Sequence, residues 1–269
     1  MNNFHRRFLL AFLAAASLLA GCATQAPQAS PLEKSTLAPT GKLRVGVYLG
    51  SPTSLVINPK TGEKNGVSYD LGRELAQRLE VPFEPVEFGR VAEVVEALRA
   101  GKIDFTITNA SAARARLVDF SEPLIDLELG YLVPAGSLLT SVDDIDRPGM
   151  LVGVSQGSTS QGVLGTRFRH AKVVPAPTLK VAAEWLKQGK LHTFATNKGI
   201  LFQMSDELAG SRVLNGRWGA EHLAIAIPKG REAGKAFIMR FARSVREEGH
   251  LQKAIAKAGL RGTAAPEAN

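Results

Sequence analysis

The sequence predicts an α/β protein of two lobes, each a mostly parallel sheet flanked by helices. The first observation is a strand-helix-strand-helix-strand order that occurs twice, since this order is typical of parallel sheets. The second is an internal similarity, because L-R-A-G-K-I-D-F-T-I-T-N at 98–109 and L-K-Q-G-K-L-H-T-F-A-T-N at 186–197 share Leu, Gly-Lys and a final Thr-Asn at the same spacing. Two lobes of similar build indicate one ligand held between them.

Residues 1–21 have the pattern of a secretory signal peptide. A histidine and two arginines precede an apolar run that is too short to span a bilayer comfortably. The segment ends in L-A-G-C at 19–22, which resembles the lipobox of bacterial lipoproteins, and Cys22 is the only cysteine of the chain. We therefore expect a lipid on Cys22 and a periplasmic protein anchored to a bacterial membrane, the alternative being an ordinary signal peptide with a chance cysteine.

Residues 22–40 predict a flexible tether, because Ala, Pro, Gln, Ser and Thr dominate without apolar periodicity. The folded part is expected at 41–262, about 220 residues, which is ample for two lobes. Removal of 1–21 takes away two arginines and no acids, so the formal net charge of +8 becomes +6. This excess favours anionic ligands or lipid headgroups. No basic run with interleaved aromatic residues indicates nucleic-acid binding.

Lobe one is expected to comprise residues 41–128 and 222–262. Its expected elements, in chain order, are a strand at 43–48, a helix at 70–79, a strand at 81–88, a helix at 91–100 and a strand at 103–108. The strands are predicted from β-branched, alternating residues, and the helices from leucines and valines that recur on one face. Helical patterns within 236–260 are expected to dock on this lobe and close the fold.

Lobe two is expected to comprise residues 129–221. Its expected elements are an extended crossing at 128–134, a short helical turn from Ser141, a strand at 150–155, a strand at 173–174, a helix at 179–188 and a strand at 191–196. The strand at 150–155 repeats the V-G-V of the first strand of lobe one. A further apolar run at 221–228 is expected to carry the chain back to lobe one.

Polar residues follow the expected strands in both lobes. Thr108 ends a strand of lobe one, and Asn109, Ser111 and Arg114 come directly after it. Ligands of open α/β sheets bind at the carboxyl ends of the strands, so these four residues are candidates for ligand binding. In lobe two, Q-G-S-T-S at 156–160 lies between a strand and a helix, where free N–H groups suit an anion. Together these features predict a pocket for a small carboxylate.

Six segments of the folded part occur in an informative order. They are L-R-V-G-V, G-V-S-Y-D-L, L-R-A-G-K-I-D-F, A-R-A-R-L-V-D-F-S-E-P, V-G-V-S-Q-G-S-T and A-I-A-I-P-K-G. Together they resemble the family-three solute-binding proteins of bacterial ABC importers, the polar amino-acid binders. The resemblance implies the type II periplasmic-binding-protein fold, with two hinge strands and a ligand in the cleft. It also implies a monomer without catalytic residues or cofactor, whose partner is an ABC permease in the inner membrane.

The same resemblance implies roles for individual residues. Arg114 matches the arginine that holds the ligand's α-carboxylate, for which a guanidinium offers two parallel hydrogen bonds. Asn109 and Ser111 match polar positions of the same loop. Ser158 and Thr159 match the donors of the second lobe that reach the carboxylate when the lobes close.

Asn197 departs from the family pattern, which usually presents an aspartate to the ligand's α-ammonium at this place. A neutral amide is a poorer partner for a buried ammonium than a carboxylate. Either another acid meets the amine, or the ligand is not an α-amino acid, and the sequence leaves both open. Ser51 stands where an aromatic residue often stacks on the ligand. Tyr48, Tyr69 and Trp218 are the candidates to replace that aromatic residue.

Three functions follow from the sequence. The favoured one is a lipid-anchored periplasmic protein that captures a small carboxylate-bearing solute for an ABC importer. The second is an enzyme that resembles cyclohexadienyl dehydratases, which would need a general acid of raised pKa in the cleft. The third is a ligand-sensing lipoprotein that is not coupled to transport. No metal site is expected, because the five histidines show no ligand spacing with one another or with Cys22.

Overall fold

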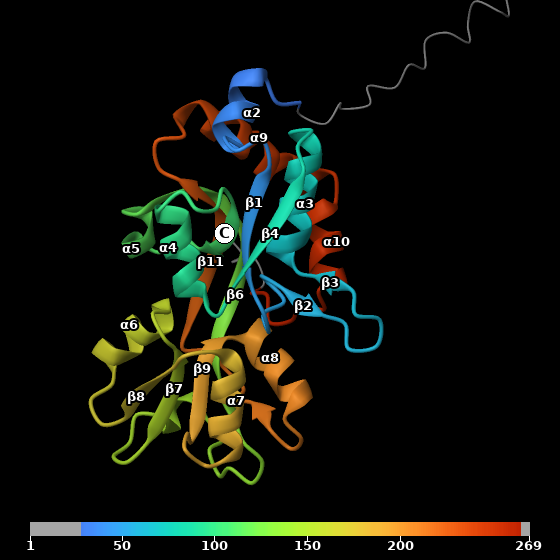
Figure 1. Ribbon diagram of the computed structural model, residues 1–269. Coiled ribbons are helices and arrows are strands. Elements are labelled where there is room, and N and C mark those ends of the chain that lie inside the picture. Colours follow the sequence, from blue (N-terminus) through green and yellow to red (C-terminus); the bar gives the residue numbers. More distant parts are fainter. Residues whose placement is uncertain (1–27, 265–269) are drawn as a thin grey trace, which may run out of the picture.

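The computed structural model describes residues 28–264 and has two lobes joined by long shared strands (Figure 1). The shared strands are β6 (Val118–Val133) and β11 (Gly219–Pro228), which pair antiparallel along most of their length. The predicted signal peptide and the predicted lipidation site, Cys22, lie outside the described residues. Within 28–264, no helix has the length and apolar character needed to cross a membrane.

Lobe one is built on β1 (Leu43–Tyr48), which pairs in parallel with β4 (Phe83–Phe88). A single parallel bridge joins β1 to the segment before β5 (Thr106–Asn109), and β5 pairs antiparallel with β11. The helices of this lobe are α3 (Val67–Arg78), α4 (Val91–Arg99), α5 (Ala112–Ala115), α9 (Glu232–Glu247) and α10 (His250–Lys257). The predicted strands and helices are therefore confirmed, with ends displaced by a few residues.

The core of lobe one explains why these segments are helical. Leu71 and Leu75 recur on one face of α3, and Phe237 and Phe241 recur on one face of α9. All four side chains are at most 1% exposed and belong to one buried cluster with the valines of β1. This apolar stripe at helical spacing is what fixes both helices against the sheet.

Lobe two repeats the parallel arrangement with its own core. Here β7 (Leu151–Ser155) pairs in parallel with β8 (Lys172–Ala176) and with β9 (Thr193–Asn197). The helices that accompany these strands are α6 (Thr159–Arg167), α7 (Leu179–Lys187) and α8 (Lys198–Glu207), and a 3-10 turn, η1, covers Val142–Asp144. Separate buried clusters fill this lobe. We keep the division at 128/129 and 221/222 as our proposal for the boundary between the lobes.

The repeated V-G-V has the same packing reason in both lobes. A side chain at Gly46 of β1 would collide with Ile103 and Val94. A side chain at Gly153 of β7 would collide with Leu191 and Phe194. The central glycine therefore lets neighbouring side chains lie directly against the strand.

The crossing between the lobes is longer than predicted. It was expected at 128–134, whereas β6 begins at Val118 and has 16 residues. Its first part pairs with β11, and its last residues pair antiparallel with β9, so one seven-stranded sheet runs through both lobes. The short strand β10 (Arg212–Val213) adds to the end of β6. The two expected hinge strands are thus the longest pair of the fold.

Residues 31–37 correct the predicted tether of 22–40, because they form helix α2 (Pro31–Leu37). Ser30 accepts a hydrogen bond from the backbone of Glu33, whose side chain accepts one from the backbone of Ser30, which is a capping box. Leu37 is 1% exposed and packs against the lobe-one core. The chain is therefore fixed to the outer end of lobe one before the first strand begins (Figure 1).

Two smaller features of the turn-rich and C-terminal segments were not predicted. Strands β2 (Val56–Ile57) and β3 (Lys64–Asn65) pair antiparallel within the loop that follows β1. At the C-terminal end, Ala264 donates its backbone N–H to Asp126 at 2.8 Å, and Gly262 accepts from Glu128 at 3.0 Å. The end of the described chain therefore lies along β6 where the lobes meet.

Candidate functional site: the cleft between the lobes

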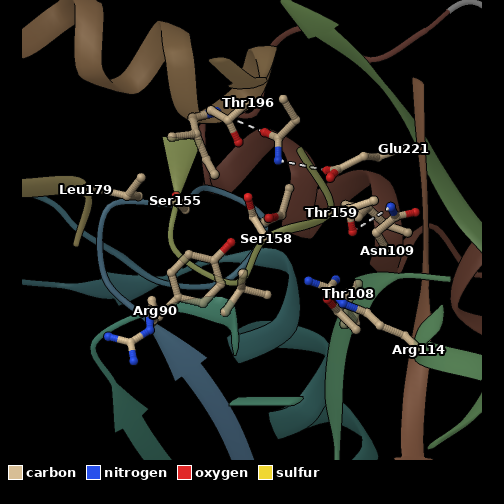
Figure 2. Close-up of a pocket in the computed structure, with 17 residues that line it drawn as sticks. Arg90, Thr108, Asn109, Arg114, Ser155, Ser158, Thr159, Leu179, Thr196 and Glu221 are labelled. Atoms are coloured by element: carbon tan, nitrogen blue, oxygen red, sulfur yellow. Dashed lines mark hydrogen bonds between the residues drawn. The ribbon is translucent and has the colours of Figure 1, made fainter. Parts of the chain in front are cut away.

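A pocket lies between the two lobes at the carboxyl ends of their strands (Figure 2). Lobe one contributes Tyr48, Thr53, Arg90, Val91, Ile107, Thr108, Asn109 and Arg114, lobe two contributes Ser155, Ser158, Thr159, Leu179, Thr196, Asn197 and Ile200, and β11 contributes Glu221 and Leu223. Of the residues that the sequence proposed for the ligand, all belong to this set except Ser111 and two of the aromatic candidates, Tyr69 and Trp218. Their roles toward a ligand remain proposals.

Arg114 is a buried cation without an acid in ion-pair contact among the described residues. It is 9% exposed, and one guanidinium nitrogen donates to the Thr108 hydroxyl at 2.6 Å. Burial lowers the pKa of Arg114, and the nearby charge of Glu221 opposes this shift. Because a buried charge needs a partner, the free edge of this guanidinium suits an anionic group of a ligand.

Ser111 has a local role instead of lining the pocket. Its hydroxyl caps the short helix α5 by accepting from the backbone N–H of Arg114 at 3.4 Å. It contributes to a second hollow between α4, α5 and α6, which shares Arg114 and Thr159 with the pocket. The Ser111 cap holds the backbone of Arg114, and a contact of Ser111 with a ligand stays a prediction.

The first turn of α6 reaches the pocket from lobe two. Ser158 caps this helix by accepting from the backbone of Gln161 at 3.2 Å. The hydroxyl of Thr159 accepts from the Asn109 amide at 3.4 Å, which is a hydrogen bond between the lobes (Figure 2). The first N–H groups of a helix have no acceptor within it, so this turn offers donors to an anion held against Arg114.

Glu221 is a pocket-lining acid that the sequence analysis did not propose. It lies on β11, is 8% exposed, and accepts from the Asn197 amide at 3.1 Å. Burial raises the pKa of Glu221, while the charge of Arg114 and the hydrogen bond from Asn197 oppose the shift. The acid at the start of the apolar run E-H-L-A-I-A-I-P was the available signal.

The Asn197 side chain makes two hydrogen bonds, one to Glu221 and one that caps a helix. Its amide oxygen accepts from the backbone of Ile200 at 3.1 Å and caps α8, while its nitrogen donates to Glu221. Asn109 has a matching position on the other side, because its oxygen accepts from the backbone of His222 at 3.2 Å. Both amides therefore fix the surroundings of the one acid among the lining residues.

The three aromatic candidates differ in whether they line the pocket. Tyr48 lines the pocket, and burial raises the pKa of its phenol. Tyr69 packs edge-on against Phe83 with ring centres 5.1 Å apart, and Trp218 packs against Tyr131 at 6.1 Å. Tyr69 and Trp218 do not belong to the set that lines the pocket, so Tyr48 alone of these three is available to a ligand there.

The rims of the two lobes touch beside the pocket. Gly157 before α6 has a φ of +73°, and a β-carbon built on it would lie 2.6 Å from that of Ala92 in α4. On the other side, a β-carbon on Gly50 would lie 3.2 Å from Leu179. The two glycines therefore permit a close approach, and the lobes enclose the pocket. No cluster of three metal-binding side chains exists within 28–264.

Fold and cleft together define a type II periplasmic binding protein. Residues 43–260 match the family described as "Bacterial extracellular solute-binding proteins, family 3". The chain belongs to this family, as its sequence motifs indicated.

The comparisons include one curated relative over nearly the whole length. It is the glutamine-binding protein of an ABC transporter from Bacillus subtilis (strain 168), 25% identical over 255 residues, which are 91% of this chain and 93% of the relative.

Two solved structures share the fold. A solute receptor for L-cysteine of Neisseria gonorrhoeae has a TM-score of 0.74 at 23% identity, covering 84% of this chain and 92% of that chain. An ancestral amino acid-binding protein, described as a precursor of cyclohexadienyl dehydratase, has a TM-score of 0.72 at 23% identity, covering 85% of this chain and 99% of that chain.

Proposed function

We propose that this protein binds a small α-amino acid in the cleft and delivers it to the permease of an ABC importer. The observation that carries the proposal is the convergence of Arg114 and the first turn of α6 on one pocket from opposite lobes. Such an arrangement suits an α-carboxylate. The names of the relatives, which bind glutamine and cysteine, support an amino acid as the ligand.

Glu221 supplies the acid that the family pattern has at position 197 and that this chain, with Asn197, lacks there. Its carboxylate and the Arg114 guanidinium both line the pocket, so an ammonium and a carboxylate on one carbon atom could each find an opposite charge. Asn197 then orients Glu221 instead of contacting the amine as a counter-ion. This assignment favours an α-amino acid over a simple carboxylic acid, which would leave Glu221 without a cationic partner.

Cleft closure provides the mechanism of capture. The ligand contacts lobe one through Arg114 and lobe two through the turn at Thr159, so it binds the closed form more tightly than the open form. A ligand shifts an equilibrium only by this difference in affinity. Bending at β6 and β11 would separate the lobes and release the ligand. No catalytic step is needed.

The proposal predicts a ligand-dependent response to Glu221→Gln. A thermal-shift screen of amino acids, amides, keto acids and dicarboxylates first identifies an amino acid that stabilises the protein. Glu221→Gln should then weaken the binding of that amino acid roughly 10- to 100-fold, since a buried ammonium loses its counter-ion. Affinity for the matching 2-hydroxy acid should stay the same or rise. Equal loss for both compounds would contradict the assignment of Glu221 to the amine.

The raised pKa of Glu221 gives the same assignment a pH dependence. An ammonium binds the ionised carboxylate, so affinity should rise as pH increases through the raised pKa and then level off. The folding stability of the ligand-free protein should change in the opposite direction. The raised pKa of Glu221 adds stability at low pH, and this contribution is lost as pH rises through that pKa. Calorimetric titrations at increasing pH, starting near the ordinary glutamate pKa of about 4.3, should show the affinity increase in the wild type and a flat profile in Glu221→Gln.

Asn197→Asp is expected to reduce affinity, although it restores the usual family residue. The new carboxylate would lie beside Glu221, whose oxygen is 3.1 Å from the Asn197 amide nitrogen. Two carboxylates this close raise each other's pKa, so one would stay protonated and the pair would gain no net charge. We expect a loss of about threefold to tenfold in amino-acid affinity by calorimetry. A tenfold gain would show that Glu221 does not already neutralise the amine.

A second candidate function rests on the same residue. A buried carboxyl of raised pKa in a cleft meets the requirement for a general acid, which the enzyme hypothesis demanded. Incubation with prephenate or arogenate distinguishes the two functions. Product that forms with the wild type and disappears with Glu221→Gln would support the dehydratase, and unchanged substrate would support binding alone.

Lipid attachment at Cys22 remains part of the proposal. It would place the protein outside the cytoplasm, at a bacterial membrane, with lobe one nearest the attachment because α2 fixes the chain there. Cys22→Ser in the full chain should move the protein from the membrane fraction to the soluble fraction without changing its melting temperature. Continued membrane association of this variant would contradict the anchor.

A further inference from the structure

The pocket has two chemically distinct ends. Figure 2 shows Arg114, Asn109 and Glu221 at one end, with Arg90 and Leu179 at the other. If the α-carboxylate and ammonium occupy the first end, as the proposed function requires, the side chain of the ligand extends toward the second. The residues of this second end therefore select among amino acids.

Arg90 presents an unsatisfied donor at the second end. It precedes α4, lines the pocket, and its side chain is 27% exposed. Its Nε atom is buried and has no hydrogen-bond partner among the described residues. A buried N–H without an acceptor is costly, so an acceptor atom on the ligand would be stabilising there.

The charge of Arg90 is already matched by a neighbour. One terminal nitrogen of its guanidinium lies 3.0 Å from the Glu93 carboxylate. Glu93 is held in place because its other oxygen accepts from the backbone of Gly89 at 2.9 Å. An anionic side chain of the ligand would meet Glu93 beside Arg90, which lowers its advantage over a neutral acceptor.

Cationic side chains of a ligand find no free acid at this end, because the Glu93 carboxylate is already paired with Arg90 and hydrogen-bonded to Gly89. Glu221, at the far end of the pocket, is the one acid among the described lining residues. Tyr48 and Thr53 line the same pocket with hydroxyl groups, and the Thr53 hydroxyl lies 2.8 Å from that of Ser51. These groups both donate and accept hydrogen bonds but carry no charge.

We infer that Arg90 is a specificity-determining residue that selects an amino acid with a neutral, acceptor-bearing side chain of the carboxamide type. The amide oxygen accepts from Arg90 Nε, and the amide nitrogen donates to the hydroxyls of Tyr48 or Thr53. The inference rests on the proposed function, because it takes the α-groups to lie at the Arg114 end.

The test compares L-glutamine, L-glutamate, L-lysine and L-norleucine by calorimetry on the wild type and Arg90→Met, in which methionine keeps an unbranched apolar stem. The wild type should bind glutamine at least about tenfold more tightly than norleucine, with lysine weakest. In Arg90→Met, the affinity for glutamine should fall about tenfold, while the affinity for norleucine should change less than about twofold.

Glu93→Gln is the matched second variant, since it keeps the acceptor for Gly89 and removes only the charge beside Arg90. This variant should raise the affinity for glutamate relative to the affinity for glutamine. Equal losses for all ligands in Arg90→Met, or lysine as the best ligand of the wild type, would overturn the role of Arg90 while amino-acid binding stands. Absence of binding by any amino acid in the folded wild type would instead contradict the proposed function, and this inference with it.

Discussion

Arg114→Ala is expected to weaken amino-acid binding by roughly 100- to 1,000-fold, a loss of about 3–4 kcal/mol. The reason is that the guanidinium is 9% exposed, has no acid in contact among the described residues, and is held by Thr108 toward the pocket. Removing it leaves the α-carboxylate of the ligand buried without a cation. Calorimetric titration with an amino acid from the thermal-shift screen measures the effect.

Arg116→Ala provides the matched control for Arg114. It removes a guanidinium two positions further along the chain, from a side chain exposed to solvent. Affinity should stay within about twofold of the wild type, because exposed charges contribute little. If Arg114→Ala bound the amino acid as tightly as Arg116→Ala, the α-carboxylate would lie elsewhere. Melting curves of both variants verify that the fold is retained.

Asp104→Ala is expected to cost about 3–5 kcal/mol of unfolding free energy, because it leaves the buried Arg231 and the half-buried Arg44 without the carboxylate that they share. Its side chain is 0% exposed and contacts Arg44 and Arg231 at 2.8 and 2.7 Å. Arg231 also donates to the backbone oxygen of Leu37 at 2.9 Å, so the carboxylate ties together β1, the start of α9 and the end of α2. Urea unfolding of the mature chain measures the loss.

Glu96→Ala is the comparison for Asp104. Glu96 pairs with Arg99 in the next turn of α4, and both side chains are more than half exposed. Its removal should leave the urea midpoint unchanged within error, because solvent screens such pairs. An Asp104→Ala variant as stable as Glu96→Ala would show that the buried charges rearrange without cost.

The strand and helix order could be predicted because local patterns fix it. Alternating valines mark β1, and leucines at helical spacing mark α3. The early part of β6 was missed because Glu122 and Pro123 interrupt its apolar pattern, and its pairing with β11 is distant in the sequence. Helix α2 was missed although Ser30 and Glu33 formed a readable capping box within a polar segment.

The site was predicted where it follows from strand ends and missed where it depends on distant pairing. Thr108 and Asn109 end β5, and Arg114 follows shortly after it. Their place at the pocket could therefore be predicted from the sequence. Glu221 reaches the pocket only because β11 returns between β5 and β6, which no local pattern reveals. Ser111 was predicted for the ligand from its place after β5, and its side chain caps α5.

The central claim is that an α-amino acid lies between Arg114 and Glu221 with its carboxylate also facing α6. A crystal structure of the protein with the amino acid that stabilises it most is the most direct measurement. We expect a carboxylate oxygen within hydrogen-bond distance of the Arg114 guanidinium and of the Thr159 backbone N–H, and the ammonium against the Glu221 carboxylate. A ligand with its carboxylate at the Arg90 end, or bound outside this cleft, would contradict the account.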